Sequence, residues 1–359
     1  MEGAGLVLAG GGGKGIYQVG MIKSLAAAGL LDDIVAVSGT SIGSVNAVLF
    51  AEGLVEGRLE YEKSLAGQQA ENNEDLKRAA AIKHAVQQME STWDDIDFHV
   101  FFDFETANVQ VGDSHFSRYE TEKLIDKYLS YELFENESAL PTYVTSAQCP
   151  PNVITYEHIS AEEYRLLTSG SVDETYRNYI VEYMQLNNKS NEYIKKAILA
   201  TTALPVIYSP VTVDGKLYVD GGVKDNVPIK PLYDMGIRRF IVIELDTVSG
   251  IKYPAQYSDA EIIDILPSHE LGKLISGTMN FDSEDKAIKK ELGIRDGKRY
   301  IKTLFEKDES YIAIEKELAL RDYNDIITQR EFKKNYDRLE SDIESRFDYI
   351  RDIENKYKF

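Results

Sequence analysis

One serine of this 359-residue chain stands in a setting that is typical of a nucleophile. Ser41 is the central residue of a Gly-x-Ser-x-Gly pattern, Gly39–Gly43, which follows the apolar run Ile34–Val37 and precedes a helical pattern. A sharp strand–turn–helix connection of this kind exposes a serine hydroxyl at the carboxyl edge of a sheet. The pattern therefore predicts attack on an acyl carbonyl, with an ordinary helix-capping serine as the plain alternative.

A nucleophilic serine needs a base, and Asp220 is the candidate. It ends the strand-like run Lys216–Val219 and is followed by Gly221 and Gly222, which let the backbone pack closely. A carboxylate that accepts the serine proton directly needs no histidine. The alternative is a Ser-Asp-His triad that uses His269, the one histidine of the sequence that follows Asp220.

A glycine-rich loop between the first predicted strand and the first predicted helix suits an anion, because backbone N–H groups converge at a helix N-terminus. The loop consists of Gly10, Gly11, Gly12, Gly13, Lys14 and Gly15. It would serve as an oxyanion hole beside a catalytic serine. The alternative is a nucleotide-binding loop for a dinucleotide pyrophosphate, since Gly-x-Gly-x-x-Gly also fits and Asp32 and Asp33 follow roughly 20 residues on.

The elements that must position these residues alternate along the chain. Strands are predicted at Leu6–Ala9, Ile34–Val37, Thr142–Ala147, Lys216–Val219 and Phe240–Leu245, and helices at Gly15–Ala28, at Val45–Ala51 with an end near Gly53, from Asn191, and at Pro231–Met235. Strand–helix–strand–helix order within the first 50 residues predicts a parallel sheet covered by helices, an α/β fold.

Two other regions are predicted to be mainly helical. We expect a hydrolase domain over residues 1–250, with a helical insertion at about 56–140, followed by a helical C-terminal region over 251–359. Within that region, Gly293–Tyr300 is predicted to be a turn-rich joint, and residues 310–359 show the three- and four-residue apolar spacing of an amphipathic helix.

Taken together, the motifs resemble the patatin-like phospholipase family over residues 5 to 247. The resemblance rests on four segments in order: Gly10–Gly15, Gly39–Gly43, the small-residue run Ala200–Pro205, and Asp220-Gly221-Gly222 followed by Asn226-Val227-Pro228. It implies a three-layer α/β/α core and a Ser41–Asp220 dyad, without a metal or other cofactor. It also implies an oxyanion hole at Gly11, Gly12 and Gly13, with Lys14 nearby, and lipid acyl hydrolase activity on phospholipids or other fatty-acyl esters. An interaction protein with a vestigial core is the remaining alternative.

Net charge and cysteine content limit the classes of binding partner and the cellular compartment that we expect. Forty Lys and Arg against 60 Asp and Glu give a formal net charge of −20, which argues against nucleic-acid binding. Any contact with a membrane surface should be transient and rest on apolar residues near the active site. A single cysteine, Cys149, and the lack of a signal-peptide or membrane-spanning pattern lead us to expect a cytoplasmic protein, peripheral at a membrane if it meets one.

Overall fold

The computed structural model describes residues 3–64, 73–97, 118–151, 176–205 and 207–305. Met1–Phe305 form one compact unit and Glu306–Phe359 a second. The amphipathic helix predicted for residues 310–359 lies outside the described residues.

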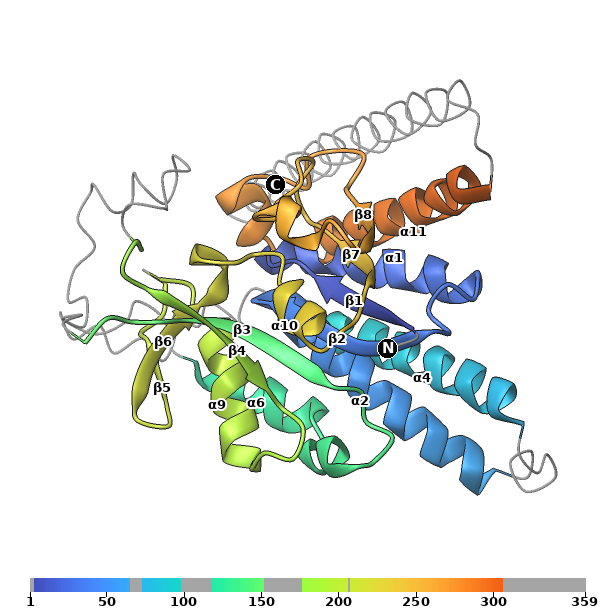
Figure 1. Ribbon diagram of the computed structural model, residues 1–359, viewed down its shortest axis with the longest axis horizontal. Helices are drawn as coiled ribbons and strands as arrows, with labels where there is room; N and C mark the ends of the chain where they lie inside the picture. Colours follow the sequence, from blue (N-terminus) through green and yellow to red (C-terminus); the bar gives the residue numbers. More distant parts are fainter. Residues whose placement is uncertain (1–2, 65–72, 98–117, 152–175, 206, 306–359) are drawn as a thin grey trace, which may run out of the picture. The chain divides into compact units, whose positions relative to one another are not determined.

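An eight-stranded sheet forms the centre of the first unit (Figure 1). Its order is β5-β6-β3-β2-β1-β7-β8, and β4 also pairs with β3. The strands are β1 Ala4–Leu8, β2 Ile34–Thr40, β3 Thr142–Gln148, β4 Ile180–Gln185, β5 Val211–Val213, β6 Lys216–Asp220, β7 Arg239–Ile243 and β8 Glu261–Ile265. Neighbours from β3 through β2, β1 and β7 to β8 run parallel, whereas β4, β5 and β6 join antiparallel pairs. The predicted α/β class is confirmed.

Strand β3 pairs with three other strands, and these pairings bring the ends of β2 and β6 together near the centre of the sheet. β4 follows β3 from Tyr143 to Gln148. β2 pairs in parallel as far as Thr40 opposite Thr145, and β6 pairs antiparallel and ends with Asp220 opposite Ser146. A strand has only two edges, so β2 and β6 must share one of them. Their carboxyl ends therefore meet head to head at neighbouring residues of β3.

Helices cover both faces of the sheet, which gives the predicted three layers. Short helix α10, Lys230–Asp234, packs its Leu232 into a core with Val7 and Phe240 from the centre of the sheet. On the opposite face lie α1, Ile16–Ala27, and α2, Ile42–Lys63, with α4, Glu74–Asp95, against both of them (Figure 1). Helix α9, Asn191–Thr201, contacts β3 and β5. The helix predicted from Asn191 is thus confirmed.

Helix α2 is much longer than predicted, because Gly53 does not end it. Both Gly53 and Gly57 lie inside the helix on the side that faces α4. A Cβ at Gly53 would come within 2.5 Å of the Ala85 Cα, and one at Gly57 within 2.7 Å of the Ala81 Cα. These glycines therefore permit two helices to approach closely and do not stop one, so the predicted end near Gly53 was wrong.

The sheet and its helical cover continue past residue 250. β8 extends the sheet beside β7, and helix α11, Ser283–Phe305, packs along α1. The turn-rich joint predicted at Gly293–Tyr300 is wrong, since these residues are helical. A Cβ at Gly293 would lie 2.2 Å from the Tyr17 carbonyl oxygen, so this glycine again serves close helix packing. The domain boundary at 250 stays a prediction, although the compact unit includes residues on both sides of it.

The described part of the expected insertion is helical. α4 supplies the buried Trp93, and α6, Tyr119–Tyr128, follows the gap at residues 98–117. Among the described residues, no helix is both long and apolar enough to cross a membrane.

Candidate active site

Ser41 occupies a strained turn between β2 and α2. Its φ of 54° and ψ of −128° lie outside the regions that residues other than glycine favour. The glycines around it are required by space: a Cβ at Gly39 would lie 2.3 Å from the Gly43 oxygen, and one at Gly43 2.3 Å from the Leu8 oxygen. The strand–turn–helix setting predicted for Ser41 is therefore present.

Asp220 lies beside Ser41 at the other strand end that β3 holds. The Ser41 hydroxyl donates a hydrogen bond to the Asp220 carboxylate, and the Gly222 N–H donates another, at 2.8 Å. Asp220 is only 3% exposed. Burial raises the pKa of this carboxyl to about 6, although both hydrogen bonds and the charge of Arg118 act in the opposite direction. Gly221 is required here because a Cβ would lie 2.3 Å from the Thr145 oxygen.

The glycine-rich loop passes on the other side of Ser41. Gly10 is held by Asn226, whose side chain donates to the Gly10 oxygen at 3.1 Å and whose backbone oxygen accepts from the Gly10 N–H at 3.3 Å. A Cβ at Gly10 would lie 3.1 Å from the Ser41 Cβ, so only glycine lets the loop come this close. Gly11 and Gly12 line the cavity that contains Ser41, whereas Gly13 is buried. The structure thus brings two of the three expected oxyanion glycines to the site.

A network of buried side-chain hydrogen bonds contacts both ends of the glycine-rich loop. The Trp93 Nε1 donates to the Asn46 Oδ1 at 2.8 Å, and the Asn46 amide donates to Gln18 at 2.8 Å and to the Gly15 oxygen at 3.0 Å. Gln18 in turn donates to the oxygens of Ala9 and Ile243. These contacts join four elements at the loop, and no spacing in the sequence indicated them.

Thr201 at the end of α9 holds the backbone of Ser41. Its hydroxyl accepts from the Ser41 N–H at 3.0 Å and donates to the Thr145 oxygen, and it lies 3.0 Å from the Ser44 hydroxyl. Thr201 and Asn226 were not predicted as site residues. The signal was available, because both belong to runs on which the family resemblance rests.

The cavity above Ser41 measures about 400 Å³. Its polar lining includes Ser41, Asp220, Asn226 and the Lys14–Asp246 ion pair, in which the Lys14 Nζ is 2.7 Å from the Asp246 oxygen. Its apolar lining consists of Ile42, Leu204, Ile207, Met279 and Phe281. Polar groups thus gather at the serine while apolar side chains form the walls. In the described part of the chain, no group of three or more His, Cys, Asp or Glu side chains could hold a metal ion.

His269 does not line this cavity. Its Nδ1 lies 3.0 Å from the Ser268 hydroxyl, and Asp296 and Arg299 of α11 supply the charges that act on it. Burial lowers its pKa. The structure therefore does not assemble the alternative triad of Ser41, Asp220 and His269.

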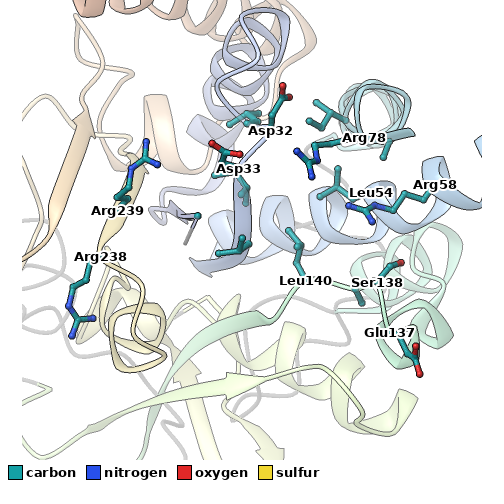
Figure 2. A pocket seen from close by; sticks show the side chains of 17 residues that line it. Asp32, Asp33, Leu54, Arg58, Arg78, Glu137, Ser138, Leu140, Arg238 and Arg239 are labelled. Atoms are coloured by element: carbon teal, nitrogen blue, oxygen red, sulfur yellow. The ribbon is translucent and has the colours of Figure 1, made fainter. Parts of the chain in front are cut away.

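The carboxylates of the nucleotide-binding alternative lie at the wrong end of the sheet. Asp32 and Asp33 precede β2, and the Asp33 oxygen accepts from the N–H of Ala4 at the start of β1, whereas the glycine loop follows the end of β1. They line a second cavity of about 850 Å³ together with Arg58 and Arg78 (Figure 2). Although this cavity is larger, neither the glycine loop nor Ser41 lines it. A dinucleotide therefore could not span the loop and these carboxylates as the fingerprint requires.

A mostly parallel sheet with helices on both faces places the protein in the three-layer α/β/α class. Within that class, the sequence model of the patatin-like phospholipase family matches residues 6–233, and the chain belongs to this family. The resemblance inferred from the motifs is confirmed.

Curated relatives carry one name. The chain is 27% identical over 258 residues to "Lysophospholipase NTE1" of Cryptococcus neoformans var. neoformans serotype D, which covers 71% of this chain and 12% of the relative. It is 24% identical over 258 residues to the protein of the same name from Candida albicans, which covers 72% and 14%. The chain thus spans about an eighth of the length of these relatives. Among solved structures, VipD from Legionella pneumophila aligns with a TM-score of 0.40 at 15% identity, over 84% of this chain and 67% of that one.

Proposed function

We propose that the protein is a serine-dependent lipid acyl hydrolase in which Ser41 is the nucleophile and Asp220 its base. The observation that carries the proposal is the hydrogen bond from the Ser41 hydroxyl to a buried carboxylate at the polar end of an otherwise apolar cavity. Membership of the patatin-like phospholipase family supports the same reaction class.

The reaction would proceed in two halves. Asp220 accepts the Ser41 proton as the Oγ attacks the ester carbonyl, and the N–H groups of Gly11 and Gly12 hold the oxyanion. Asp220 then gives this proton to the departing alcohol or lysolipid, which leaves an acyl group on Ser41. In the second half, Asp220 takes a proton from water and the resulting hydroxide attacks the acyl carbonyl. The bond to the Ser41 Oγ then breaks, the fatty acid is released, and Ser41 recovers its proton from Asp220.

The environment of Asp220 suits this role. A carboxyl group with a pKa of about 6 is ionised at neutral pH, yet it is a stronger base than an ordinary solvated carboxylate. General-base efficiency is greatest when the pKa of the base lies near the working pH. The strained backbone of Ser41 holds the Oγ in place, because Thr201 and β3 fix the residues around it.

We propose phospholipids and lysophospholipids as the substrate class. An acyl chain would lie along the apolar side chains of the cavity, whose volume falls within the range of roughly 300–1,000 Å³ typical of small-molecule sites. The relatives named lysophospholipase favour a single-chain substrate as the first to be tried.

The test is labelling of the purified protein with a fluorophosphonate probe, followed by intact-mass measurement and by assay of fatty-acid release from lysophosphatidylcholine. We expect one adduct at Ser41, no adduct and no hydrolysis in Ser41→Ala, and slow labelling in Asp220→Asn. Ser64→Ala, at the far end of α2, is the matched control and should behave as the wild type. Hydrolysis that persists in a folded Ser41→Ala protein would refute the assignment.

A further inference from the structure

Arg118 is a half-buried cation whose contacts converge on one wall of the candidate active site. It precedes α6, and its Nη1 and Nη2 donate to the carbonyl oxygens of Leu199 and Ser209 at 2.7 and 2.8 Å. Its guanidinium carbon lies 4.7 Å from the centre of the Tyr208 ring. Burial lowers the pKa of Arg118 to about 10, so it remains charged at neutral pH.

The two carbonyls that Arg118 binds lie at the two ends of the segment Leu199–Ser209, which passes beside Ser41 and Asp220. Between Leu199 and Ser209, the Thr201 hydroxyl accepts from the Ser41 N–H, and the Ala203 oxygen accepts from the Asp220 N–H at 2.8 Å. Three residues of the same segment line the cavity with apolar or aromatic surface: Leu204, Ile207 and Tyr208. One guanidinium thus holds the ends of a segment that contacts both members of the proposed dyad.

A lysine could not replace this arrangement. The planar guanidinium presents several N–H groups in a fixed fork, which allows it to bind two carbonyls while it stacks on an aromatic ring. An ammonium group at the same place would keep the charge but would lose the forked geometry and the stacking. The effect of the positive charge can therefore be separated from the effect of the two hydrogen bonds by comparing Arg118→Lys, which keeps the charge, with Arg118→Met, which does not.

We propose that Arg118 is a positioning residue for the dyad and for the acyl-binding wall: it clamps the segment from Leu199 to Ser209 and places a positive charge that favours the ionised form of Asp220. This inference rests on the proposed function. It also assigns a role to the expected helical insertion, because α6 would fix the site directly.

The charges that act on Asp220 have few sources. Ser41 and the Gly222 N–H hydrogen-bond its carboxylate, and Arg118 is the charged residue that favours its ionised form. The other titratable groups that line the cavity are Tyr208 and the Lys14–Asp246 pair, in which the two charges offset one another. Loss of the Arg118 charge should therefore be visible in the pH dependence of Asp220.

The test measures the rate of fluorophosphonate labelling from pH 4.5 to 8, and KM for a long-chain acyl ester, in Arg118→Met and Arg118→Lys. Arg118→Met should move the acid limb of the labelling profile to higher pH, because the charge of Arg118 lowers the pKa of Asp220 and its loss would disfavour the ionised carboxylate. Arg118→Lys should leave the limb in place. Both variants should raise KM several-fold, since Met donates no hydrogen bond and Lys lacks the planar fork that binds the two carbonyls while it stacks on Tyr208.

Arg239→Met is the matched control. Arg239 begins β7, the strand beside edge strand β8, and its side chain is 58% exposed and pairs with Glu261, so its loss should change neither quantity. A folded Arg118→Met protein with the wild-type limb would refute the electrostatic role, since a merely structural role would lower the rate equally at every pH. Should Arg118→Met fail to fold, an unchanged KM in Arg118→Lys would refute the clamp. Absence of labelling in the wild type would instead refute the proposed function, and this inference with it.

Discussion

At the scale of single residues, the site combines a strained serine with a carboxylate that has lost most of its water. Asp220 carries a raised pKa because burial outweighs its hydrogen bonds and the charge of Arg118. Ser41 adopts a positive φ because the chain must turn sharply between β2 and α2. Each feature costs stability locally, and together they place a buried carboxylate beside a serine hydroxyl.

This residue-scale balance predicts a pH profile. If Asp220 must be ionised to accept the Ser41 proton, kcat/KM should be constant above about pH 7 and fall as the pH drops through about 6, roughly tenfold per unit below that. Asp220→Asn should lower kcat by about 10²- to 10⁴-fold. Initial rates with a short-chain ester, with stability checked at each pH, would measure both. A limb near pH 4 would mean that burial does not raise the pKa of the titrating carboxyl.

Local sequence patterns predicted the candidate catalytic residues but not the residues that position them. Ser41 and its glycines are neighbours in the chain, and Asp220 is marked by the glycines after it, so each leaves a short signature. Arg118 binds carbonyl oxygens that lie 81 and 91 positions further along the chain. Trp93 is 47 positions from its partner Asn46. Such contacts leave no spacing to recognise, because the fold alone brings them together.

At the scale of elements, glycine within helices sets how closely the layers pack. Gly20 on α1 approaches α11, and Gly53 and Gly57 on α2 approach α4. These pairs hold the helices that begin at the glycine loop and at Ser41. From the sequence, Gly53 was predicted to end a helix and Gly293 to begin a turn-rich joint, because glycine is a common helix terminator and its packing role depends on a partner helix.

Gly293→Ala should therefore destabilise the protein, even though alanine is the better helix former by about 1 kcal/mol. The added methyl would meet the Tyr17 carbonyl oxygen at 2.2 Å, and overpacking typically costs about 1–3 kcal/mol. Urea denaturation would measure the free energy of unfolding, with Lys298→Ala, an exposed position of the same helix, as the control. A more stable Gly293→Ala protein would show that α1 and α11 are not in close contact.

The strands that were not predicted also show that pairing within the fold decides which weak patterns form secondary structure. Strands β1, β2, β3, β6 and β7 were predicted from the sequence, but β4, β5 and β8 were not. Within β8, Glu261–Ile265 carries a charge at each of two positions and alternates only weakly. It gains its place from pairing with β7 at the edge of the sheet. Pairing partners are a property of the fold, so a weak run becomes a strand where a neighbour offers free backbone groups.

At the scale of the whole molecule, one buried acid works against stability. Glu52 on α2 is 1% exposed, and burial, together with the charge of Glu56, raises its pKa to about 9. The folded protein thus keeps a proton that the unfolded chain releases above about pH 4.5. Stability from this group is fully present below that pH and declines as the pH rises towards 9.

Glu52→Gln should remove this decline. We expect its free energy of unfolding to exceed that of the wild type by about 2–4 kcal/mol at pH 7.5 and by little at pH 4.5. Denaturant titrations at the two pH values would measure the difference, with Glu135→Gln as an exposed control. An equal difference at both pH values would contradict a titrating Glu52.

The net charge of −20 predicts how the protein meets lipid surfaces. At low ionic strength, fatty-acid release should be faster from vesicles of zwitterionic phosphatidylcholine than from vesicles that contain anionic phosphatidylglycerol. The gap should shrink in about 0.5 M salt, because the Debye length falls from about 10 Å at 0.1 M to about 3 Å at 1 M. A preference for the anionic vesicles at low salt would indicate a local basic surface that overrides the overall charge.

The head-to-head meeting of β2 and β6 on β3 also bears on how such a chain can diversify. Thr145 and Ser146 are the β3 partners of the two strand ends, and Leu199–Ser209 is the part of the β3–β6 connection that also contacts Ser41 and Asp220. Insertions or deletions elsewhere in that connection could reshape the entrance and substrate range while the proposed dyad stays in place. The same arrangement delays maturation of the site during synthesis: Ser41 emerges from the ribosome well before Asp220, and the nascent chain has no complete dyad until β6 has docked.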